Sequence, residues 1–260
     1  MKEKYSFEDF LGIMDTLRSK DGCPWDKAQT HESLRQYLIE EAYEAVDAID
    51  NQDMDNLCEE LGDVLLQIVF HAKIESEKNG FTMDDVIDGV SKKMIRRHTH
   101  IFSDDVANTP EEVMRTWENN KKAEKGFETD TQAVKNVPRS LPALMRAEKV
   151  QKKAADSGFD FENINQTIEK AKEEFQEFSE ALFDGKGNVE EEFGDILFSF
   201  VNIARFLKIN PEFALTNAVE KFINRFEYVE NTALRGGKSL SGLTQEELDY
   251  YWSQSKRKGY

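Results

Sequence analysis

An acidic motif that occurs twice constrains this chain more than any other feature of its sequence. The first copy is Glu40-Glu41-Ala42-Tyr43-Glu44, followed further along by Glu60-Leu61-Gly62-Asp63. The second copy is Glu173-Glu174-Phe175-Gln176-Glu177, followed by Glu192-Phe193-Gly194-Asp195. Because residues three apart lie on one face of a helix, each copy predicts two helices that carry paired acidic side chains.

Each acidic pair borders an apolar stripe that repeats at the helical period of about 3.6 residues. The stripe beside Glu41 consists of Leu34, Leu38, Ala42, Ala45, Val46 and Ile49. The stripe beside Glu60 consists of Leu61, Val64, Leu65, Ile68 and Val69. Two such helices, packed through their apolar faces, would bring both acidic edges to one rim.

Four carboxylates gathered at one rim would repel each other, by roughly 3 kcal/mol for each pair at about 6 Å and an effective dielectric constant of about 20. Such a rim requires a cation or protons. A ligand set made only of oxygen suits Mg²⁺ or Mn²⁺ better than zinc. The alternative is a merely soluble Glu-rich surface, but that does not explain why both copies place the acidic pairs at matching positions beside the stripe.

The composition describes a globular and strongly acidic chain. Its 260 residues are 39% hydrophobic and 33% charged, and the formal net charge is −17, which argues against nonspecific binding to nucleic acid or to anionic membranes. Cys23 and Cys58 are too few for a disulfide framework and fit a reducing compartment. No apolar run is long enough to span a bilayer, so we expect a soluble cytoplasmic protein.

Start and stop signals divide the chain into helices, and no alternating strand pattern stands out, so the expected fold class is all-α. Gly22 and Pro24 interrupt the pattern after the first helix. Thr82 with Asp85 resembles a capping box, and Thr109-Pro110 is a clear helix start. The expected helices run from Ser6 to about Ser19, from Thr30 to about Asn51, from Asp53 to Asn79-Gly80, from Thr82 to about Arg97, and onward from Thr109.

An internal duplication organises the whole chain into two tandem helical bundles. Glu40 corresponds to Glu173 and Asp63 to Asp195, so the separation between matching positions is nearly constant across the motif. Residues 125–137 contain few apolar side chains and are the expected linker between a first domain, 1–124, and a second domain, 138–260.

A basic pair and a Trp-Lys pair also recur in both copies. Lys93 and Arg97 match Lys221 and Arg225, and Trp117 and Lys121 match Trp252 and Lys256. A Lys-x-x-x-Arg pair on one helix face can bind phosphate oxygens, although most such pairs are only solvated surface. The tryptophan could stack on a base or close the core, and the sequence leaves both open.

These ingredients narrow the chemistry to metal-dependent attack of water on the phosphate chain of a nucleotide. No Ser-His-Asp set is present, and neither cysteine is a plausible nucleophile. The residues themselves do not indicate which phosphorus is attacked.

The chain resembles the MazG family of nucleoside triphosphate pyrophosphohydrolases in its two-domain form, over nearly its whole length. The resemblance rests on the two acidic motifs and on further matching segments: Cys23-Pro24-Trp25-Asp26, Gln29-Thr30-His31, Arg96-Arg97-His98, Gly158-Phe159-Asp160, Asn202-x-x-Arg205 and Lys221-Phe222-x-x-Arg225. It implies an all-α bundle, a tight homodimer, magnesium, and cleavage of a nucleoside triphosphate to the monophosphate and pyrophosphate. Family members usually have proline where Thr99 stands.

The resemblance also implies a role for each matching residue. Glu40 and Glu173 would hold or deprotonate the attacking water. The metal ligands would be Glu41, Glu44, Glu60 and Asp63 in the first half and Glu174, Glu177, Glu192 and Asp195 in the second. The nucleotide-binding residues would be Lys93, Arg97, Trp117 and Lys121 in the first half and Lys221, Arg225, Trp252 and Lys256 in the second.

Two alternatives to a hydrolase with two working copies stay open at this point. One or both copies could bind nucleotide and magnesium without cutting, as a regulatory module with a silent domain. A carboxylate bundle that holds iron ranks last, because the acidic helices lack the Glu-x-x-His spacing of di-iron sites. Whichever holds, we expect uncovered apolar helix faces to pair across a two-fold axis, and those faces contain Phe198, Phe200, Val201 and Phe206.

Overall fold

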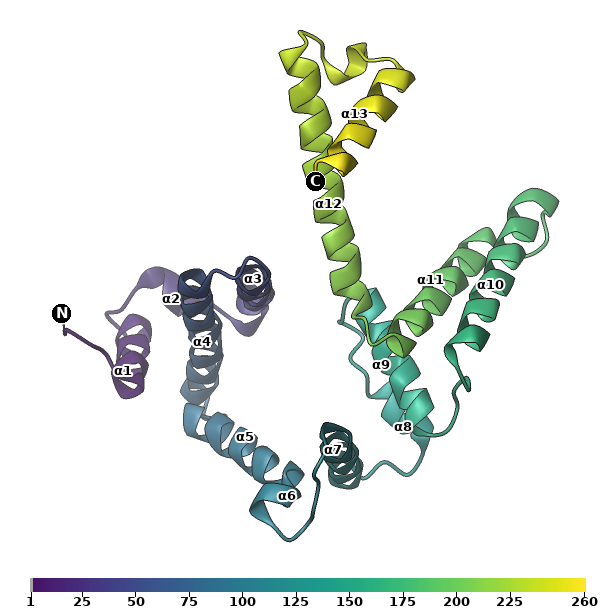
Figure 1. The fold of residues 1–260 in the computed structure, drawn as a ribbon. Helices are drawn as coiled ribbons and strands as arrows, with labels where there is room; N and C mark the ends of the chain where they lie inside the picture. The colour runs from purple at the N-terminus through teal and green to yellow at the C-terminus, as the bar shows by residue number, and fades with distance from the viewer. Residues whose placement is uncertain (1) are drawn as a thin grey trace. The chain divides into compact units, whose positions relative to one another are not determined.

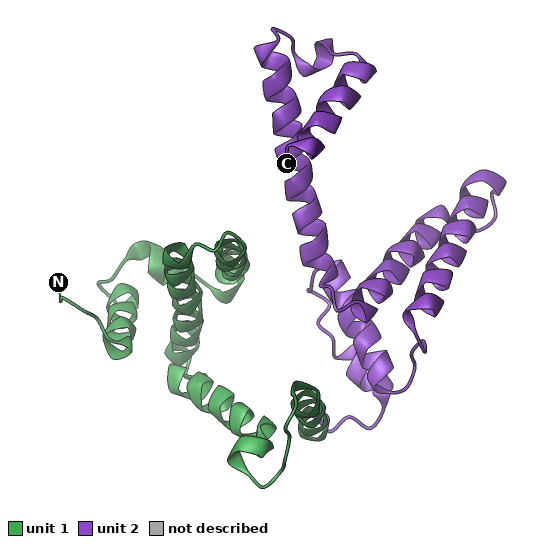
Figure 2. Cartoon of the chain, viewed as in Figure 1, with its two compact units in different colours: residues 1–124 green, residues 125–260 purple. Residues whose placement is uncertain are grey.

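A computed structural model describes residues 2–260, apart from the side chain of Lys122. All regular elements in the described part of the chain are helical, which confirms the expected all-α class. The chain divides into two compact units, residues 1–124 and residues 125–260 (Figure 2). Each unit contains one copy of the acidic motif.

The first unit is built around an antiparallel pair of long helices, α3 and α4, joined by a short turn at residues 51–53. Helix α1 packs against α4, and the core between α1, α3 and α4 contains Met14, Leu34, Val69, Phe70 and Ile74. The helices of this unit are α1 (Phe7–Arg18), α2 (Pro24–Ala28), α3 (His31–Asp50), α4 (Met54–Glu77), α5 (Met83–Arg97), α6 (Thr99–Phe102) and α7 (Pro110–Lys125).

Capping residues fix the helix starts that the sequence predicts. Ser6, Thr30 and Thr82 each accept a hydrogen bond from the backbone N–H three residues later, and each belongs to a reciprocal capping box. The Thr30 box closes through the hydroxyl of Ser33, which accepts from the Thr30 N–H at 2.9 Å. The expected break after α1 contains the short helix α2, which begins at Pro24, because proline is compatible with the first helical turn.

The second unit has two arms that diverge from a common base, as Figure 1 shows. One arm is the antiparallel hairpin of α10 and α11, and the other consists of α12 with α13 folded back along it. Helix α9 packs against α11 and α12 at the base. The helices are α8 (Asp130–Lys135), α9 (Ala143–Asp156), α10 (Ile164–Asp184), α11 (Val189–Phe206), α12 (Pro211–Arg235) and α13 (Gln245–Arg257), with a 3₁₀ turn at Leu240–Gly242.

Residues 125–137, expected as a linker, are part of the second unit. They contain helix α8, which packs against α9, and they bury Ala133 and Val137. These two apolar side chains are enough to attach the segment to the unit, although the rest of it is polar. The segment that connects the two units therefore contains a helix, α8, that is packed against the second unit.

The apolar face that was expected to be uncovered is only partly so. Val201 is 2% exposed and belongs to the core of the second unit, because α9 packs against α11. Phe198 and Phe200 are exposed, as expected, whereas Phe206 is half-buried. None of the helices in the described residues combines the length and the apolar character that crossing a membrane requires.

Candidate active site

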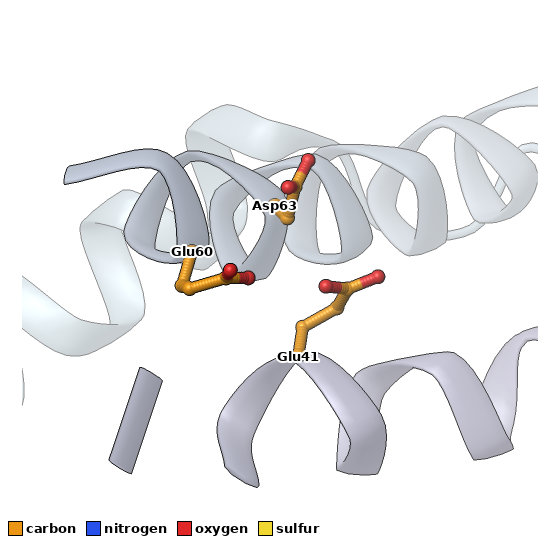
Figure 3. Close-up of side chains that lie close together, drawn as sticks. All are labelled: Glu41, Glu60 and Asp63. Carbon is orange, nitrogen blue, oxygen red and sulfur yellow. The ribbon is translucent and has the colours of Figure 1, made fainter. Parts of the chain in front are cut away.

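Three carboxylates of the first unit meet between α3 and α4. Glu41 extends from α3 toward Glu60 and Asp63 on α4 (Figure 3). One carboxylate oxygen from each residue lies within 4.8 Å of the other two. The arrangement follows from the sequence, because the antiparallel helix pair packs through the apolar stripes and leaves the acidic edges side by side.

The second unit repeats this geometry between α10 and α11. Oxygens of Glu174, Glu192 and Asp195 also lie within 4.8 Å of one another. Glu174 is only 8% exposed, whereas Glu192 is half-buried and Asp195 is exposed. Both clusters have the all-oxygen composition that hard divalent cations prefer, and the residues present therefore fit such an ion.

The fourth acidic residue of each motif lies beside its cluster. Burial raises the pKa of Glu60, and Glu44 raises it further, more than any other charged neighbour does. The pKa of Glu177 is raised by burial and then by the charge of Glu174. The structure thus brings three of each four expected ligands into one tight group and holds the fourth within electrostatic reach.

The pKa of Glu41 in the first cluster is raised above its ordinary value. Burial raises the pKa of Glu41, and the carboxylates of Asp63, Glu44 and Glu60 raise it further. A raised carboxyl pKa means that the folded site favours a proton, or another cation, over a bare negative charge.

The second cluster contains a cation of its own that sequence reasoning missed. The ammonium of Lys170 lies 2.9 Å from carboxylate oxygens of both Glu173 and Glu174, and these carboxylates raise its pKa. In the first unit Tyr37 stands at the corresponding position, since Glu40 corresponds to Glu173. The i,i+4 spacing of Lys170 and Glu174 was a signal that could have revealed the pair.

The two candidate catalytic glutamates lie beside the clusters on the same helices as the ligands. Glu40 on α3 is exposed, and Glu173 on α10 is exposed apart from its contact with Lys170. Exposure leaves both carboxylates accessible to water.

The candidate nucleotide-binding residues of the second unit lie on the other arm, on α12 and α13 (Figure 1). The guanidinium of Arg225 lies over the ring of Trp252, 5.9 Å from its centroid, and donates from Nε to the carbonyl of Tyr260 at 2.7 Å. Lys221 and Lys256 are exposed. The structure groups Arg225 with Trp252, but it places this group and the acidic cluster on different arms.

In the first unit the matching arginine is already engaged. Arg97 is 8% exposed, donates from Nε to Glu124 at 3.0 Å, and lies over Trp117, 5.2 Å from the ring centroid. Lys121 pairs with Glu118 at 3.6 Å, and Lys93 is half-buried. The two units therefore use equivalent residues differently: the first buries its arginine in an ion pair, and the second holds a half-buried Arg225 against the main-chain oxygen of Tyr260 and the ring of Trp252.

A cavity of about 230 Å³ adjoins the second acidic cluster, and sequence reasoning missed it as well. Its lining includes Glu174, Asp195 and Lys170, together with Gln151 from α9 and Asn202 from α11. Asn202 was noted only as part of a family motif, and Gln151 gave no signal because its position depends on the packing of α9 against α11.

Comparisons with known proteins agree with this geometry. The model of the MazG nucleotide pyrophosphohydrolase domain matches residues 29–102 and again residues 159–231, so it covers both acidic helix pairs. A Thermotoga maritima protein named nucleoside triphosphate pyrophosphohydrolase/pyrophosphatase MazG is 45% identical over 96% of this chain and 95% of its own length. The nucleoside triphosphate pyrophosphohydrolase of Escherichia coli K12 is 42% identical over 95% of both chains.

The uncharacterized protein YabN of Bacillus subtilis is 48% identical over 97% of this chain, which spans about half of that longer protein, 52%. The family model matches both halves, and the identities extend over nearly the full length of the chain. This protein therefore belongs to the MazG nucleotide pyrophosphohydrolase family.

Proposed function

We propose that this protein hydrolyses nucleoside triphosphates to nucleoside monophosphates and pyrophosphate, with Mg²⁺ held at the acidic clusters and Mn²⁺ able to replace it. The single observation that carries the proposal is the convergence of Glu174, Glu192 and Asp195 to within 4.8 Å beside a cavity. The names of the Thermotoga maritima and Escherichia coli relatives support the same reaction.

Each group of residues has a defined task in this reaction. Glu174, Glu177, Glu192 and Asp195 would hold the ion, which when bound supplies positive charge next to the phosphate chain. Glu173 orients the attacking water and accepts its proton, because it is exposed directly beside the ligands. Lys221 and Arg225 bind phosphate oxygens, and Trp252 with Lys256 closes over the nucleotide.

We further propose that the chain works as a homodimer in the cytoplasm. Both arms of the second unit expose large apolar side chains, among them Phe200 on α11 and Phe222 on α12, each 55% exposed. In the first unit, Leu61 of the stripe beside the acidic cluster is also 55% exposed. Apolar surface of this extent favours burial against a second copy, and two-fold dimers are the commonest homo-oligomers. The acidic net charge supports neither nucleic acid nor membrane as a partner.

A second reading, in which only the second unit cuts and the first binds or regulates, is favoured by one observation. Arg97 is buried in its pair with Glu124, whereas Arg225 donates to the main-chain oxygen of Tyr260 and pairs with no Asp or Glu side chain among the described residues. A phosphate that approached the first unit would have to displace Glu124 from Arg97, at the cost of a half-buried ion pair.

The test is product analysis with ATP. We expect AMP and pyrophosphate as primary products, no turnover in excess chelator, and recovery with Mg²⁺ or Mn²⁺. ADP and orthophosphate as primary products, or full turnover by protein shown to be free of metal, would refute the proposed reaction. Comparing the single variants Asp63→Asn and Asp195→Asn then shows which unit turns over. Nucleotide binding without turnover in the first unit would support its regulatory role.

A further inference from the structure

Two histidines of the first unit meet where the start of α3 lies against α4. His31 is the first residue of α3, and His71 lies in the second half of α4. The Nδ1 atoms of the two rings are 2.7 Å apart, and Nε2 of His31 lies 2.7 Å from a carboxylate oxygen of Glu75. Glu75, His31 and His71 therefore form one chain of polar contacts between the two helices. None of the three has a task in the proposed reaction.

The two imidazole rings meet edge to edge. Their planes differ by 8° and their centroids are 5.0 Å apart. That separation is the distance between the two Nδ1 atoms plus one ring radius on each side, so the rings are parallel without lying over each other, and the nitrogens point straight at one another. Such a contact is an N–H···N hydrogen bond with one hydrogen between the two atoms. It leaves no room for a metal ion in line, because each zinc–nitrogen bond alone is about 2.0–2.1 Å long.

The position of each hydrogen follows from what its partner can accept. The hydrogen bond with His31, and then that from Lys78, lowers the pKa of Glu75, so this carboxylate is ionised at neutral pH and can only accept. Nε2 of His31 must therefore carry a hydrogen. In the neutral ring Nδ1 of His31 is then the acceptor, and the hydrogen between the rings belongs to Nδ1 of His71. The chain thus holds His71 in its Nδ1–H form, which is the minor form of a free histidine side chain.

This chain can take up one further proton but not two. A first proton can be placed on Nε2 of His71, and it leaves the hydrogen bond between the rings intact. A second proton puts a hydrogen on both Nδ1 atoms, so two donors and two positive charges meet at the contact. Burial, and then the charge of His31, lower the pKa of His71, which is the direction that this clash requires. The added protons belong to the pair, because the two rings titrate together.

The contact between the rings lies where α3 enters the core of the first unit. Thr30 caps this helix, and Leu34, one turn further on, is 1% exposed in the core. Beside this entry, Arg18 donates to the main-chain oxygen of Asp26 and to the carboxylate of Glu77 on α4, the latter at 2.8 Å. The start of α3 is thus joined to α4 directly by the rings. Further along, the same two helices carry the first acidic cluster.

The second unit has an apolar pair at the equivalent positions. In the register of the acidic motifs, His31 corresponds to Ile164 and His71 to Ile203. Both isoleucines are half-buried, so they provide packing without a group that titrates. A helix pair of this kind can therefore be built without histidines, and the titratable chain is a property of the first unit.

We propose that Glu75, His31 and His71 form an acid-sensitive latch that fastens the start of α3 to α4. The latch is closed at neutral pH, and the second proton opens the contact between the rings. Because the folded pKa of His71 is lowered, the stability that the closed latch provides is complete above about pH 6.5 and is lost as the pH falls through the folded value. Acid should therefore loosen the start of α3 and leave the start of α10 in place.

Charged groups on the surrounding elements can also act on this titration, so the test has to leave them unchanged. They include Arg18 on α1, Asp26 on α2, Glu32 on α3, Glu75 and Lys78 on α4, and Asp84 on α5. The double variant His31→Ile with His71→Ile removes both rings, copies the pair of the second unit and alters none of these groups. Their contributions therefore cancel when the parent and the double variant are compared in the full chain, both with Mg²⁺.

Nuclear magnetic resonance of ¹⁵N-labelled histidine tests the hydrogen positions. The chain has four histidines, and His98 is an internal reference because its Nδ1 lies 2.7 Å from the carbonyl of Met94 and must carry a hydrogen. At pH 8 we expect the Nε2–H form for His31 and the Nδ1–H form for His71, with the signal of His71 close to that of His98. On titration to pH 5, the pair should take up its protons in two separate steps. An Nε2–H form of His71, or independent titration of the two rings at the ordinary histidine value, would overturn the latch.

Hydrogen exchange at pH 7.5 and pH 5.5, corrected for the intrinsic effect of pH, tests the opening. We expect protection of residues 31–37 in the parent to fall by about tenfold more than in the double variant. The melting temperature of the first unit should likewise fall by at least about 3 °C more in the parent. Residues 164–170 at the start of α10 are the control within the same sample and should respond equally in both proteins.

If the double variant does not fold, His71→Asn replaces it, because the asparagine amide can still donate to Nδ1 of His31 but cannot take up a proton. It should keep the protection of α3 at pH 5.5. An equal response of the parent and the variant to acid would overturn the proposal. A loss of protection at the start of α10 as large as that at the start of α3 would show general loosening by acid and would overturn it as well.

Discussion

The ammonium of Lys170 lies 2.9 Å from the carboxylate of Glu174, one helical turn away on α10. The second acidic cluster therefore carries a built-in counter-charge. The first cluster has Tyr37 at the matching position, and there burial together with carboxylate repulsion raises the pKa of Glu41 and of Glu60. Two copies of one motif thus balance the same negative charge in different ways, and their behaviour without metal should differ.

Replacing Lys170 by methionine should strengthen divalent-cation binding at the second cluster, because the ammonium competes with the ion for Glu174. The pair is partly exposed, so we expect only about a threefold gain in affinity. Titration of Mn²⁺ followed by its electron paramagnetic resonance signal, in an Asp63→Asn background, measures this. Lys172→Met is the control, since Lys172 pairs with the exposed Glu169 instead. Weaker Mn²⁺ binding in Lys170→Met would mean that the lysine supports the ion rather than competing with it.

Asp195→Asn should abolish most turnover of the second unit without unfolding it. The substitution keeps the shape of an exposed side chain but removes one negative ligand from the cluster with Glu174 and Glu192. With Asp63→Asn already in place, we expect a loss of at least a hundredfold in pyrophosphate release and an unchanged circular dichroism spectrum. Activity retained within a few-fold would remove Asp195 from the ligand set.

The first unit should lose stability as the pH rises when no metal is present. The folded-state pKa of Glu41 is raised, so the stabilising proton is fully bound below the unfolded value of about 4.3 and is lost as the pH rises through the folded value. Glu41→Gln, which cannot ionise, should therefore raise the melting temperature of the metal-free chain by a few degrees at pH 7 and by less at pH 4. Scanning calorimetry in chelator measures this, and the opposite pH trend would contradict the assignment.

Local signals made much of this architecture predictable. Thr30 and Thr82 fix helix starts through neighbours only three residues away, and the stripes beside Glu41 and Glu60 select the packed faces. That information lies within single helices, and it brings together three of the four carboxylates expected in each cluster. It did not reveal that Arg97 pairs with Glu124, because the partner lies 27 residues away on another helix.

The cavity at Gln151 was missed for the same physical reason. The Gln151 side chain reaches α11 only when α9 packs on that helix. There its amide N–H donates a hydrogen bond to the carbonyl of Phe198. Helix α8 was overlooked because its apolar content is low, and Ala133 and Val137 contribute through burial against the unit rather than through a periodic pattern.

The arginines of the two basic pairs should respond differently to truncation. Arg97→Ala removes a half-buried ion pair with Glu124 and the contact with Trp117, but Glu124 keeps Arg96, so we expect a loss of about 1–2 kcal/mol in the stability of the first unit. Arg96→Ala is the control, because Arg96 reaches the same carboxylate from the surface at 3.4 Å. Arg225→Ala removes one hydrogen bond to Tyr260 and the contact with Trp252, so it should cost no more than about 1 kcal/mol of stability and lower kcat/KM of the second unit. Denaturant unfolding and pyrophosphate release distinguish these effects.

The second unit should fold and work by itself, provided that it includes α8. A fragment of residues 125–260 retains the whole unit, with its acidic cluster, its cavity and its exposed apolar faces. We therefore expect it to be folded, dimeric by sedimentation, and active in pyrophosphate release.

A fragment of residues 138–260 lacks Ala133 and Val137, whose burial against the unit is worth about 2 kcal/mol, and it should unfold at a lower denaturant concentration. Equal stability of the two fragments would show that α8 does not support the unit. A fully active monomer would remove the argument for the dimer, and an unfolded 125–260 fragment would mean that the halves depend on each other.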